Sequence, residues 1–248
     1  MIKLERGERP KELTDEVCEE LKKLYAEDNN KDVWNSPKIK KPLKEAMLKM
    51  SHGKCSYCEC RLEIESKDAT IDHFLSKSKN PDKVVEWKNL FPSCLRCNRK
   101  KNNREEKIIN PCEHEPKKYL GINSVNRYRF KAIDSAGIGE NTIEVIRLND
   151  IQRVMVPRME AWELLKGRLI EIEEDLKEEG FKTKYKNKLR NIMENCLSDM
   201  DYSATKATNL LNDNTYNEIK NILMELDQWT TDLKKLEEEI GDIALKLV

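Results

Sequence analysis

The sequence has little of several features by which a protein's class is usually recognised. No apolar run approaches the roughly 18 residues of a membrane span, and the opening residues MIKLER contain no apolar core of a secretion signal. No glycine-rich phosphate-binding loop is present. The 46 basic and 46 acidic side chains cancel, so net charge alone does not indicate a nucleic-acid partner. These absences predict a cytoplasmic protein without an ATP-hydrolysing site of its own.

The composition indicates a soluble, highly charged protein with a modest core. Of 248 residues, 38% are hydrophobic and 37% are charged, and this hydrophobic content is too high for a disordered chain. The length accommodates one domain, or a small domain with a helical extension. Proline is absent after residue 157, so nothing in the last third of the sequence interrupts a helix in that way.

The cysteines gather in one stretch, and their spacing indicates a metal site. Six of the eight lie between residues 55 and 112, and four of these form two C-x-x-C pairs. Such pairs in a chain without a secretion signal favour tetrahedral structural zinc over disulfide bonds. The 35 residues between the pairs exceed a usual zinc-ribbon gap, so another element is inserted there. The predicted zinc ligands are Cys55, Cys58, Cys94 and Cys97.

The remaining four cysteines are not predicted to be zinc ligands in the first instance. Cys60 is a spare thiol that is able to replace Cys58 in the first pair. Cys18 and Cys196 lie on apolar helix faces, which is typical of core residues. Cys112 and His114 raise the question of a third metal site, but two ligands are too few, so we expect a loop there.

Positive charge is concentrated in the same stretch as the cysteines. Between residues 76 and 104 there are nine Lys or Arg and only two Asp or Glu. Such an excess favours phosphate contacts, which give affinity but little sequence reading. For individual side chains the alternative is an ordinary solvated face. The candidate phosphate contacts are Lys77, Lys79, Lys83, Lys88, Arg96, Arg99, Lys100, Lys101 and Arg104.

The segment between the cysteine pairs predicts two strands followed by a helix. Residues 69–74, ATIDHF, are β-branched and aromatic and read as a short strand that carries Asp72 and His73. A polar loop follows, and residues 87–91, which include Asn89, lead back to the second cysteine pair. Good helix formers continue from Cys94, with Asn98 on the first turns.

This segment resembles the HNH nucleases, whose fold is a ββα-metal module. The resemblance is carried by the Asp-His pair, the Asn-Leu pair and the C-x-x-C-Asn run with basic residues after it. It implies that His73 is the general base and that Asn89 orients its imidazole. It also implies that Asp72 and Asn98 bind one catalytic Mg²⁺ or Mn²⁺. The third motif residue is Asn rather than His, which leaves a weaker oxygen ligand at the metal.

The chemistry of these side chains agrees with hydrolysis of a phosphodiester. The reaction needs an activated water and a cation that neutralises developing charge. An imidazole supplies the first, and the oxygen donors of Asp72 and Asn98 suit a hard cation. Sulfur ligands suit zinc instead, so two metals with separate roles are expected.

The regions before and after the nuclease segment are predicted to be mainly helical. Thr14 is a predicted N-cap for a helix over 14–27, and a second helix runs from 42 to 51. Residues 128–132 and 142–146 read as a β-hairpin. Apolar residues recur every seven positions in 155–176 and 219–247, which predicts a helical bundle or coiled coil. This bundle either packs on itself or docks a partner.

These readings give an α+β fold that is mainly α. We expect a ββα-metal (HNH) core with a structural four-cysteine zinc site and a carboxy-terminal helical region. The expected units are an amino-terminal helical scaffold at 1–53, the nuclease core with its zinc knuckles at 54–110, a boundary loop with a β-hairpin at 111–150, and a helical partner-docking region at 151–248.

The order of these parts widens the resemblance. An opening MIKLERGERP, an HNH core, an Asn-Pro boundary and the run NTIEVIRLN are similar to the PtuB-type HNH proteins of the Septu anti-phage system and of certain retron-associated defence operons. The similarity covers about residues 1–165. It implies a bacterial effector that works beside an ABC-type ATPase, PtuA, and, in the retron setting, a reverse transcriptase with its RNA and DNA.

The sequence is compatible with three functions. A metal-dependent endonuclease that cuts DNA is favoured. An RNase, for instance one that cleaves tRNA, uses the same hydrolytic groups. A non-catalytic zinc module that binds nucleic acid or assembles a complex is the third, but it would not need the set Asp72, His73, Asn89 and Asn98.

Overall fold

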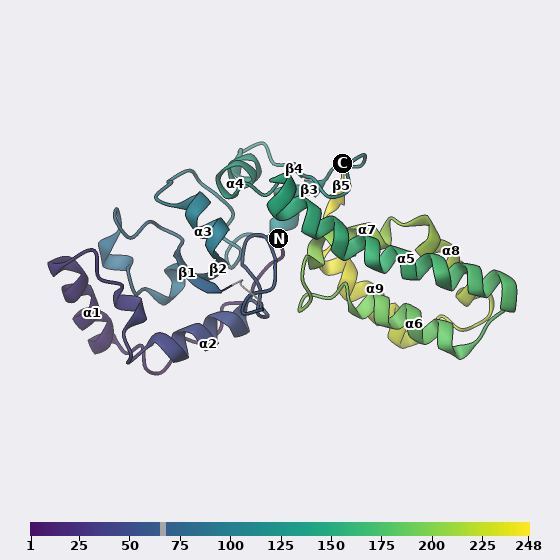
Figure 1. The fold of residues 1–248 in the computed structure, drawn as a ribbon, viewed down its shortest axis with the longest axis horizontal. Helices are drawn as coiled ribbons and strands as arrows, with labels where there is room; N and C mark the ends of the chain where they lie inside the picture. Colours follow the sequence, from purple (N-terminus) through teal and green to yellow (C-terminus); the bar gives the residue numbers. More distant parts are fainter. Residues whose placement is uncertain (65–67) are drawn as a thin grey trace.

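A computed structural model describes residues 1–64 and 68–248 (Figure 1). In the described part, the α-helices are α1 (Asp15–Glu27), α2 (Lys40–Met50), α3 (Leu95–Lys101), α4 (Ile138–Ile146), α5 (Val156–Glu179), α6 (Thr183–Glu194), α7 (Ser203–Leu211), α8 (Asn214–Glu225) and α9 (Thr231–Ile243). The strands there are β1 (Ala69–His73), β2 (Leu90–Cys94), β3 (Leu120–Ile122), β4 (Phe130–Ala132) and β5 (Lys246–Leu247). The α+β class with mainly helical content is thereby confirmed.

The amino-terminal helices pack against the loop that joins β1 to β2. The Thr14 side chain accepts a hydrogen bond from the Val17 amide and caps α1, as expected from the sequence. A short 3-10 helix, Val33–Asn35, places Trp34 between α1 and α2. Buried apolar residues from these elements and from the loop form one cluster, which includes Leu43, Val84 and Trp87. This cluster supports one side of the β1–β2 hairpin.

The predicted ββα unit is present in the expected order. Strands β1 and β2 pair antiparallel, from Ala69 opposite Cys94 to His73 opposite Leu90. Helix α3 begins directly after β2, and the Cys94 side chain accepts a hydrogen bond from the Cys97 amide at its start. The helix therefore lies along β1, the strand that carries Asp72 and His73.

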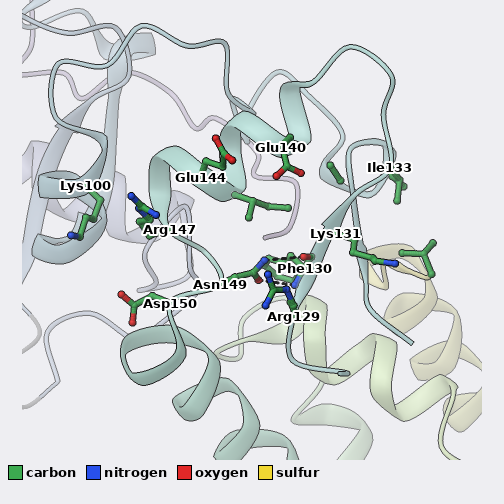
Figure 2. A pocket seen from close by; sticks show the side chains of 13 residues that line it. Lys100, Arg129, Phe130, Lys131, Ile133, Glu140, Glu144, Arg147, Asn149 and Asp150 are labelled. Carbon is green, nitrogen blue, oxygen red and sulfur yellow. Dashed lines mark hydrogen bonds between the residues drawn. The ribbon is translucent and has the colours of Figure 1, made fainter. Parts of the chain in front are cut away.

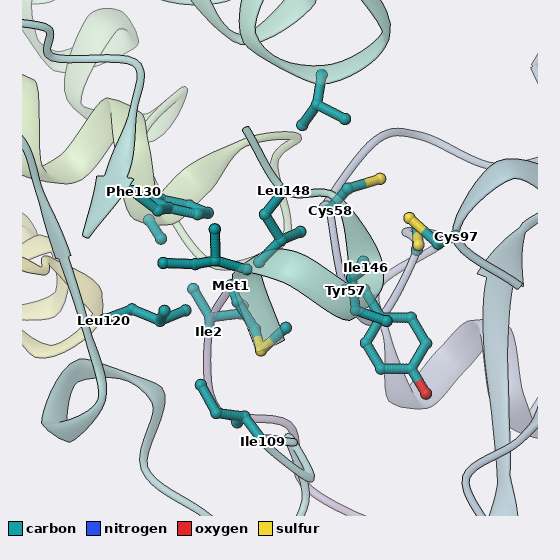
Figure 3. Close-up of a cluster of buried hydrophobic side chains, with 14 of the residues drawn as sticks. Met1, Ile2, Tyr57, Cys58, Cys97, Ile109, Leu120, Phe130, Ile146 and Leu148 are labelled. Atoms are coloured by element: carbon teal, nitrogen blue, oxygen red, sulfur yellow. The ribbon is translucent and has the colours of Figure 1, made fainter. Parts of the chain in front are cut away.

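A second sheet in the middle of the molecule brings distant segments together. Its strand order is β4–β3–β5, with β3 antiparallel to β4 and parallel to β5. The core beneath it contains apolar residues from both ends of the chain and from the zinc knuckle (Figure 3). The central labelled members are Ile2, Tyr57, Leu120, Phe130 and Ile146.

The hairpin predicted between 128–132 and 142–146 is wrong in its second arm. Residues 142–146 belong to helix α4, and β4 pairs with β3 instead. The Asp134 carboxylate accepts hydrogen bonds from the amides of Ile138 and Gly139, so it caps the start of this helix. A Cβ at Gly139 would lie 2.3 Å from the Tyr119 carbonyl oxygen, so only glycine fits there. The helix cap and the close packing therefore make residues 142–146 helical, although their β-branched composition favours a strand.

The carboxy-terminal helices form a bundle with its own apolar core. Trp162, Leu165 and Leu169 from α5 pack with residues of α6 to α9 such as Leu189 and Leu233. The second heptad repeat is not a continuous coiled coil. Its member Leu226 is 47% exposed where α8 ends, and Leu247 lies in strand β5. The long repeat is therefore divided between two short helices and a strand.

The bundle contacts the first cysteine pair through buried polar groups. The Lys54 ammonium, 1% exposed as a residue, donates to the carbonyls of Ser198 and Met200 and to the Ser203 hydroxyl. The Glu59 carbonyl accepts from the Tyr202 amide. The cysteine knuckle at residues 55–60 thus sits directly against the start of α7. Among the described residues, no helix is both long and apolar enough to cross a membrane.

Candidate active site and metal centre

Four cysteine sulfurs converge at the base of the hairpin. The Sγ atoms of Cys55, Cys58, Cys94 and Cys97 all lie within 4.8 Å of one another. The Cys58 and Cys94 sulfurs are 3.8 Å apart. A tetrahedron with Zn–S bonds of about 2.3 Å has S–S edges of roughly 3.8 Å, so the cluster fits zinc. Cys60 does not belong to this set of four, although its thiol interacts with those of Cys55, Cys58 and Cys94. The Cys60 carbonyl closes the knuckle by accepting a hydrogen bond from the Cys55 amide at 2.9 Å.

Arg96 belongs to the surroundings of this cluster. One guanidinium nitrogen lies 3.5 Å from the Cys97 sulfur and 3.2 Å from the Ile146 carbonyl oxygen, and the other donates to the Arg147 carbonyl. Its side chain is 18% exposed and 3.8 Å from Asp150. The sequence predicts that Arg96 contacts phosphate, but both terminal guanidinium nitrogens are bonded within the protein, and only the buried Nε has no partner among the described residues. It joins the thiol cluster to the end of α4.

His73 is held by a backbone carbonyl on the far side of the loop. Its Nε2 lies 2.8 Å from the Val84 oxygen, so Nε2 carries the proton and Nδ1 is left as the basic nitrogen. Burial lowers the pKa of His73 to about 4, although the hydrogen bond to Val84 opposes this. The Trp34 ring packs edge-on against the imidazole, with centroids 4.7 Å apart. The ring is therefore fixed and neutral.

Asn89 is hydrogen-bonded to the loop that holds this imidazole. Its side-chain oxygen accepts from the Leu75 amide, and its nitrogen donates to the carbonyls of Leu75 and Lys83. These three bonds close the loop between the strands at both ends. Val84, which follows Lys83, then presents its carbonyl to His73. The resemblance implies that Asn89 orients His73, and in the structure the two side chains are connected only indirectly, through Val84.

Asp72 lies on the other face of β1, buried against α3. Its two oxygens contact the Tyr57 hydroxyl at 2.5 Å and the Lys101 ammonium at 3.3 Å. Burial raises the pKa of the Asp72 carboxyl, and the charge of Lys101 partly offsets this. Lys101 also donates to the His73 carbonyl at 2.6 Å. Lys101 was expected to contact phosphate; it is only 1% exposed, so that expectation is corrected too.

Asn98 reaches β1 one turn before Lys101. Its side-chain nitrogen donates to the Thr70 hydroxyl and to the Ile71 carbonyl. Asp72 and Asn98 thus come from the two facing elements of the strand–helix seam. Both have oxygen donors, the ligand type that a hard cation such as Mg²⁺ prefers, but both Asp72 oxygens already contact Tyr57 or Lys101, so a cation bound there would have to displace one of these contacts.

A cavity opens beside this seam. Its volume is about 430 Å³, and it is lined by Asn98, Ile71 and Trp34, the last of which touches the His73 ring. Two lysines of α2 and three carboxylates also line it, whereas His73 and Asp72 do not: the charged lining residues are Lys40, Lys44, Asp32, Glu63 and Asp68. Sequence reasoning missed Trp34 and Lys40, because no motif joins α2 and the 3-10 helix to the site. Tyr57 was missed as well, although its position inside the first C-x-x-C pair was a possible signal.

The other basic candidates differ in how free they are. Lys79 is paired with Glu105, Arg104 contacts Glu106, and the Lys77 ammonium lies 4.0 Å from the Trp34 ring centroid. The side chains that are exposed and have no acidic partner within 4.0 Å among the described residues are Lys88, Arg99 and Lys100. Lys83 is half-buried.

Cys112 and His114 do not converge on a metal. The His114 Nδ1 accepts from the Asn110 amide, and the Cys112 sulfur lies 3.7 Å from the Met50 sulfur. Both residues lie in a turn, in agreement with the expected loop.

An antiparallel hairpin and a helix that carry Asp72, His73, Asn89 and Asn98 beside a four-thiol cluster define an HNH endonuclease. The HNH endonuclease family model matches residues 55–104, the stretch that forms this site. The chain is 34% identical to the Septu protein PtuB of Bacillus thuringiensis, over 95% of this chain and 92% of that relative. It therefore belongs to the Septu PtuB family and is an enzyme of the nuclease class.

A second relative supports this assignment over part of the chain. The Septu protein PtuB of Bacillus mycoides strain KBAB4 is 31% identical over 43% of this chain and 46% of its own length. No solved structure matches the fold significantly.

Proposed function

We propose that this endonuclease hydrolyses phosphodiester bonds, with DNA as the favoured substrate. In this proposal His73 is the general base, and Asp72 with Asn98 holds the catalytic Mg²⁺ or Mn²⁺. The observation that carries the proposal is the hydrogen bond from His73 Nε2 to the Val84 carbonyl. It leaves Nδ1 of a neutral, fixed imidazole as the only ring nitrogen able to accept a proton from water.

The chain's own residues divide the remaining work. Asn89 fixes the loop, and Val84 then holds the imidazole in one tautomer. The cavity beside Asn98 and Trp34 gives room for the scissile phosphate. The bound divalent cation would supply the positive charge that stabilises the developing charge on the phosphoryl oxygens. Lys101 and Tyr57 hold the Asp72 carboxylate in place.

The four cysteines take a structural role in the same proposal. A Zn²⁺ ion bound by Cys55, Cys58, Cys94 and Cys97 would have no open ligand position, which is typical of structural sites. It would join the knuckle before β1 to the start of α3. Asn98 follows the last ligand directly, so this ion would also fix the position of the catalytic helix.

The setting is proposed from family membership. Both relatives above are named Septu proteins, so we assign the Septu setting rather than the retron one. The resemblance then implies a cytoplasmic bacterial effector of anti-phage defence with PtuA, an ABC-type ATPase, as its partner. The bundle of α5 to α9 is the docking region in this proposal, because the nuclease site uses none of its residues.

Plasmid DNA and total RNA, incubated side by side with purified protein and Mg²⁺ or Mn²⁺, test the proposal. The reactions are run with and without the ATPase partner. We expect nicking or linearisation of DNA, and His73→Ala should lower the rate by about 10²- to 10⁴-fold. His52→Asn is the matched control, because His52 is exposed and its φ of 54° is tolerated by asparagine.

Two outcomes would overturn parts of this proposal. Undiminished cleavage by the His73→Ala protein would remove His73 as the base. Cleavage of RNA with intact plasmid DNA would replace the DNase assignment with an RNase one.

A further inference from the structure

A wide groove lies next to helix α3, outside the site described above. Its volume is about 840 Å³, and α4 and β4 line it together with the residues that follow α4 (Figure 2). Lys100, near the end of α3, stands at one side of it. The groove shares Lys100 with the basic run after the second cysteine pair, but it contains none of Asp72, His73, Asn89 and Asn98.

The charged side chains of the groove are unevenly paired. Four basic and three acidic residues line it: Lys100, Arg129, Lys131, Arg147, Glu140, Glu144 and Asp150. All four basic side chains are exposed, and no carboxylate lies within 4.0 Å of them in the described part of the chain. Asp150, by contrast, is 3.8 Å from Arg96. Glu140 and Glu144 are also exposed and have no cationic partner within 4.0 Å among the described residues, so the unpaired side chains of the groove carry four positive and two negative charges. This excess of positive charge suits an anion.

The basic residues are presented from a rigid frame. The Asn149 side chain accepts from the Phe130 amide and donates to the Phe130 carbonyl, which ties the floor of the groove to β4. Arg147 ends α4 in the left-handed conformation, with φ of 57°. Its carbonyl and that of Ile146 accept hydrogen bonds from Arg96 of α3. The groove is thus fixed relative to the helix that carries Asn98.

The groove also continues the basic face of α3. Arg99 and Lys100 are exposed on that helix, and Lys100 lines the groove as well. Figure 2 shows Lys100 and Arg147 on one side, with Arg129 and Lys131 further along it. A chain of phosphates that leaves the nuclease site along α3 would therefore meet basic groups across the groove.

We propose that this groove binds the sugar–phosphate backbone of the nucleic-acid substrate beyond the cleavage site, with Arg129, Lys131 and Arg147 as phosphate contacts. The proposal rests on the proposed nuclease function. Glu140 and Glu144 lie on α4 and Arg147 directly follows that helix, whereas Arg129 and Lys131 come from the β4 side of the groove (Figure 2). The proposed backbone path therefore runs from Arg147 at the end of α4 to Arg129 and Lys131. These two carboxylates weaken the binding of any polyanion, and their removal strengthens it.

Fluorescence anisotropy with labelled oligonucleotides tests this path. Single-stranded and duplex DNA and the corresponding RNA are titrated without added divalent cation, so that cleavage does not intervene. The triple variant Arg129→Gln/Lys131→Gln/Arg147→Gln should bind more weakly. The slope of log affinity against log salt, from about 50 to 200 mM, should fall by roughly 2 to 3, since each phosphate contact contributes about 0.7 to 0.9.

Matched variants separate the groove from general charge effects. Lys23→Gln/Arg168→Gln removes two exposed basic side chains from α1 and α5 and should leave the slope unchanged. Glu140→Gln/Glu144→Gln should raise affinity. It moves binding in the opposite direction from the triple variant, so a folding defect cannot imitate both results. Unchanged thermal unfolding and zinc content confirm that each variant is folded.

The outcomes distinguish this inference from the proposed function. An unchanged salt slope in the triple variant, with a wild-type protein that binds and cleaves, overturns the groove and leaves the nuclease assignment intact. Inorganic pyrophosphate and ATP are also tested as competitors of the labelled oligonucleotide. If the triple variant still binds the oligonucleotide but the competitors no longer displace it, the groove is overturned as a backbone path, and a free nucleotide is its ligand. A wild-type protein that neither binds nor cleaves nucleic acid overturns both.

Discussion

The nuclease site and the carboxy-terminal bundle are built on opposite principles. Within the described part of 55–104, several charged and polar side chains such as Glu59, Asp72 and Lys101 are buried. The buried site residues have specific partners, as Asp72 has in Tyr57 and Lys101. The bundle core consists mainly of apolar side chains such as Leu165, Ile219 and Leu233, and its buried polar side chains are concentrated in α7. The small ββα unit buries little apolar surface of its own and depends on a few strong contacts and, in the proposal above, on metal. The bundle depends on many weak ones.

The largest difference between the two regions should appear when a thiol is removed. Cys97→Ser is expected to release zinc and unfold the ββα unit, because structural zinc supplies on the order of 10 kcal/mol to such small units. Cys196→Ser, at an equally buried cysteine of the bundle core, is the control and should keep its zinc. Metal analysis and thermal unfolding measure both. A folded, zinc-loaded Cys97→Ser protein would contradict the structural site.

An intermediate effect is expected for the buried charge pair. Lys101→Met removes the ammonium beside Asp72, whose side chain is 3% exposed, and should cost about 3 to 5 kcal/mol of unfolding free energy because it strands a carboxylate. The double variant Lys101→Met/Asp72→Asn should regain part of this stability but no cleavage. Denaturant titration and a plasmid assay give the two readouts. Equal stability of the single and double variants would show that the pair is not coupled.

A comparable or smaller loss is expected in the bundle, and it should stay there. Leu233→Ala leaves a cavity in a fully buried position and should cost about 2 to 5 kcal/mol. Zinc content should be unchanged, because no thiol ligand lies in α9. Loss of zinc from this variant would mean that the two regions fold as one cooperative unit, and the contrast between them would then disappear.

The sequence predicts the parts of the site that depend on local spacing. The paired cysteines, the Asp72–His73 strand and the Thr14 cap are visible because a few neighbouring residues determine each of them. Helix α4 was mistaken for a strand, since its stability comes from Asp134 and from close packing at Gly139. Such contacts join separate segments and leave no periodicity behind.

The functions of single basic residues were the hardest to predict. Arg96 and Lys101 occupy the same basic run as Arg99 and Lys100, yet the first two turn inward. Helical spacing alone does not show which of these four side chains are buried, because that depends on the elements packed against the helix. The roles of His73, Asn89 and Asn98 came from the resemblance; the structure adds the Val84 carbonyl, which no motif contains.

The short strand β5 has a mechanical consequence for the whole molecule. The chain leaves the central sheet region for the bundle at α5 and returns as β5 beside β3. The first and the last residues of the bundle's chain segment are therefore both attached to the central sheet region. The Tyr202–Glu59 hydrogen bond adds a third attachment, at the cysteine knuckle. A lobe held in this way cannot swivel on a flexible tether. Torque applied to it by a bound partner would be transmitted as shear to the knuckle that precedes the catalytic strand.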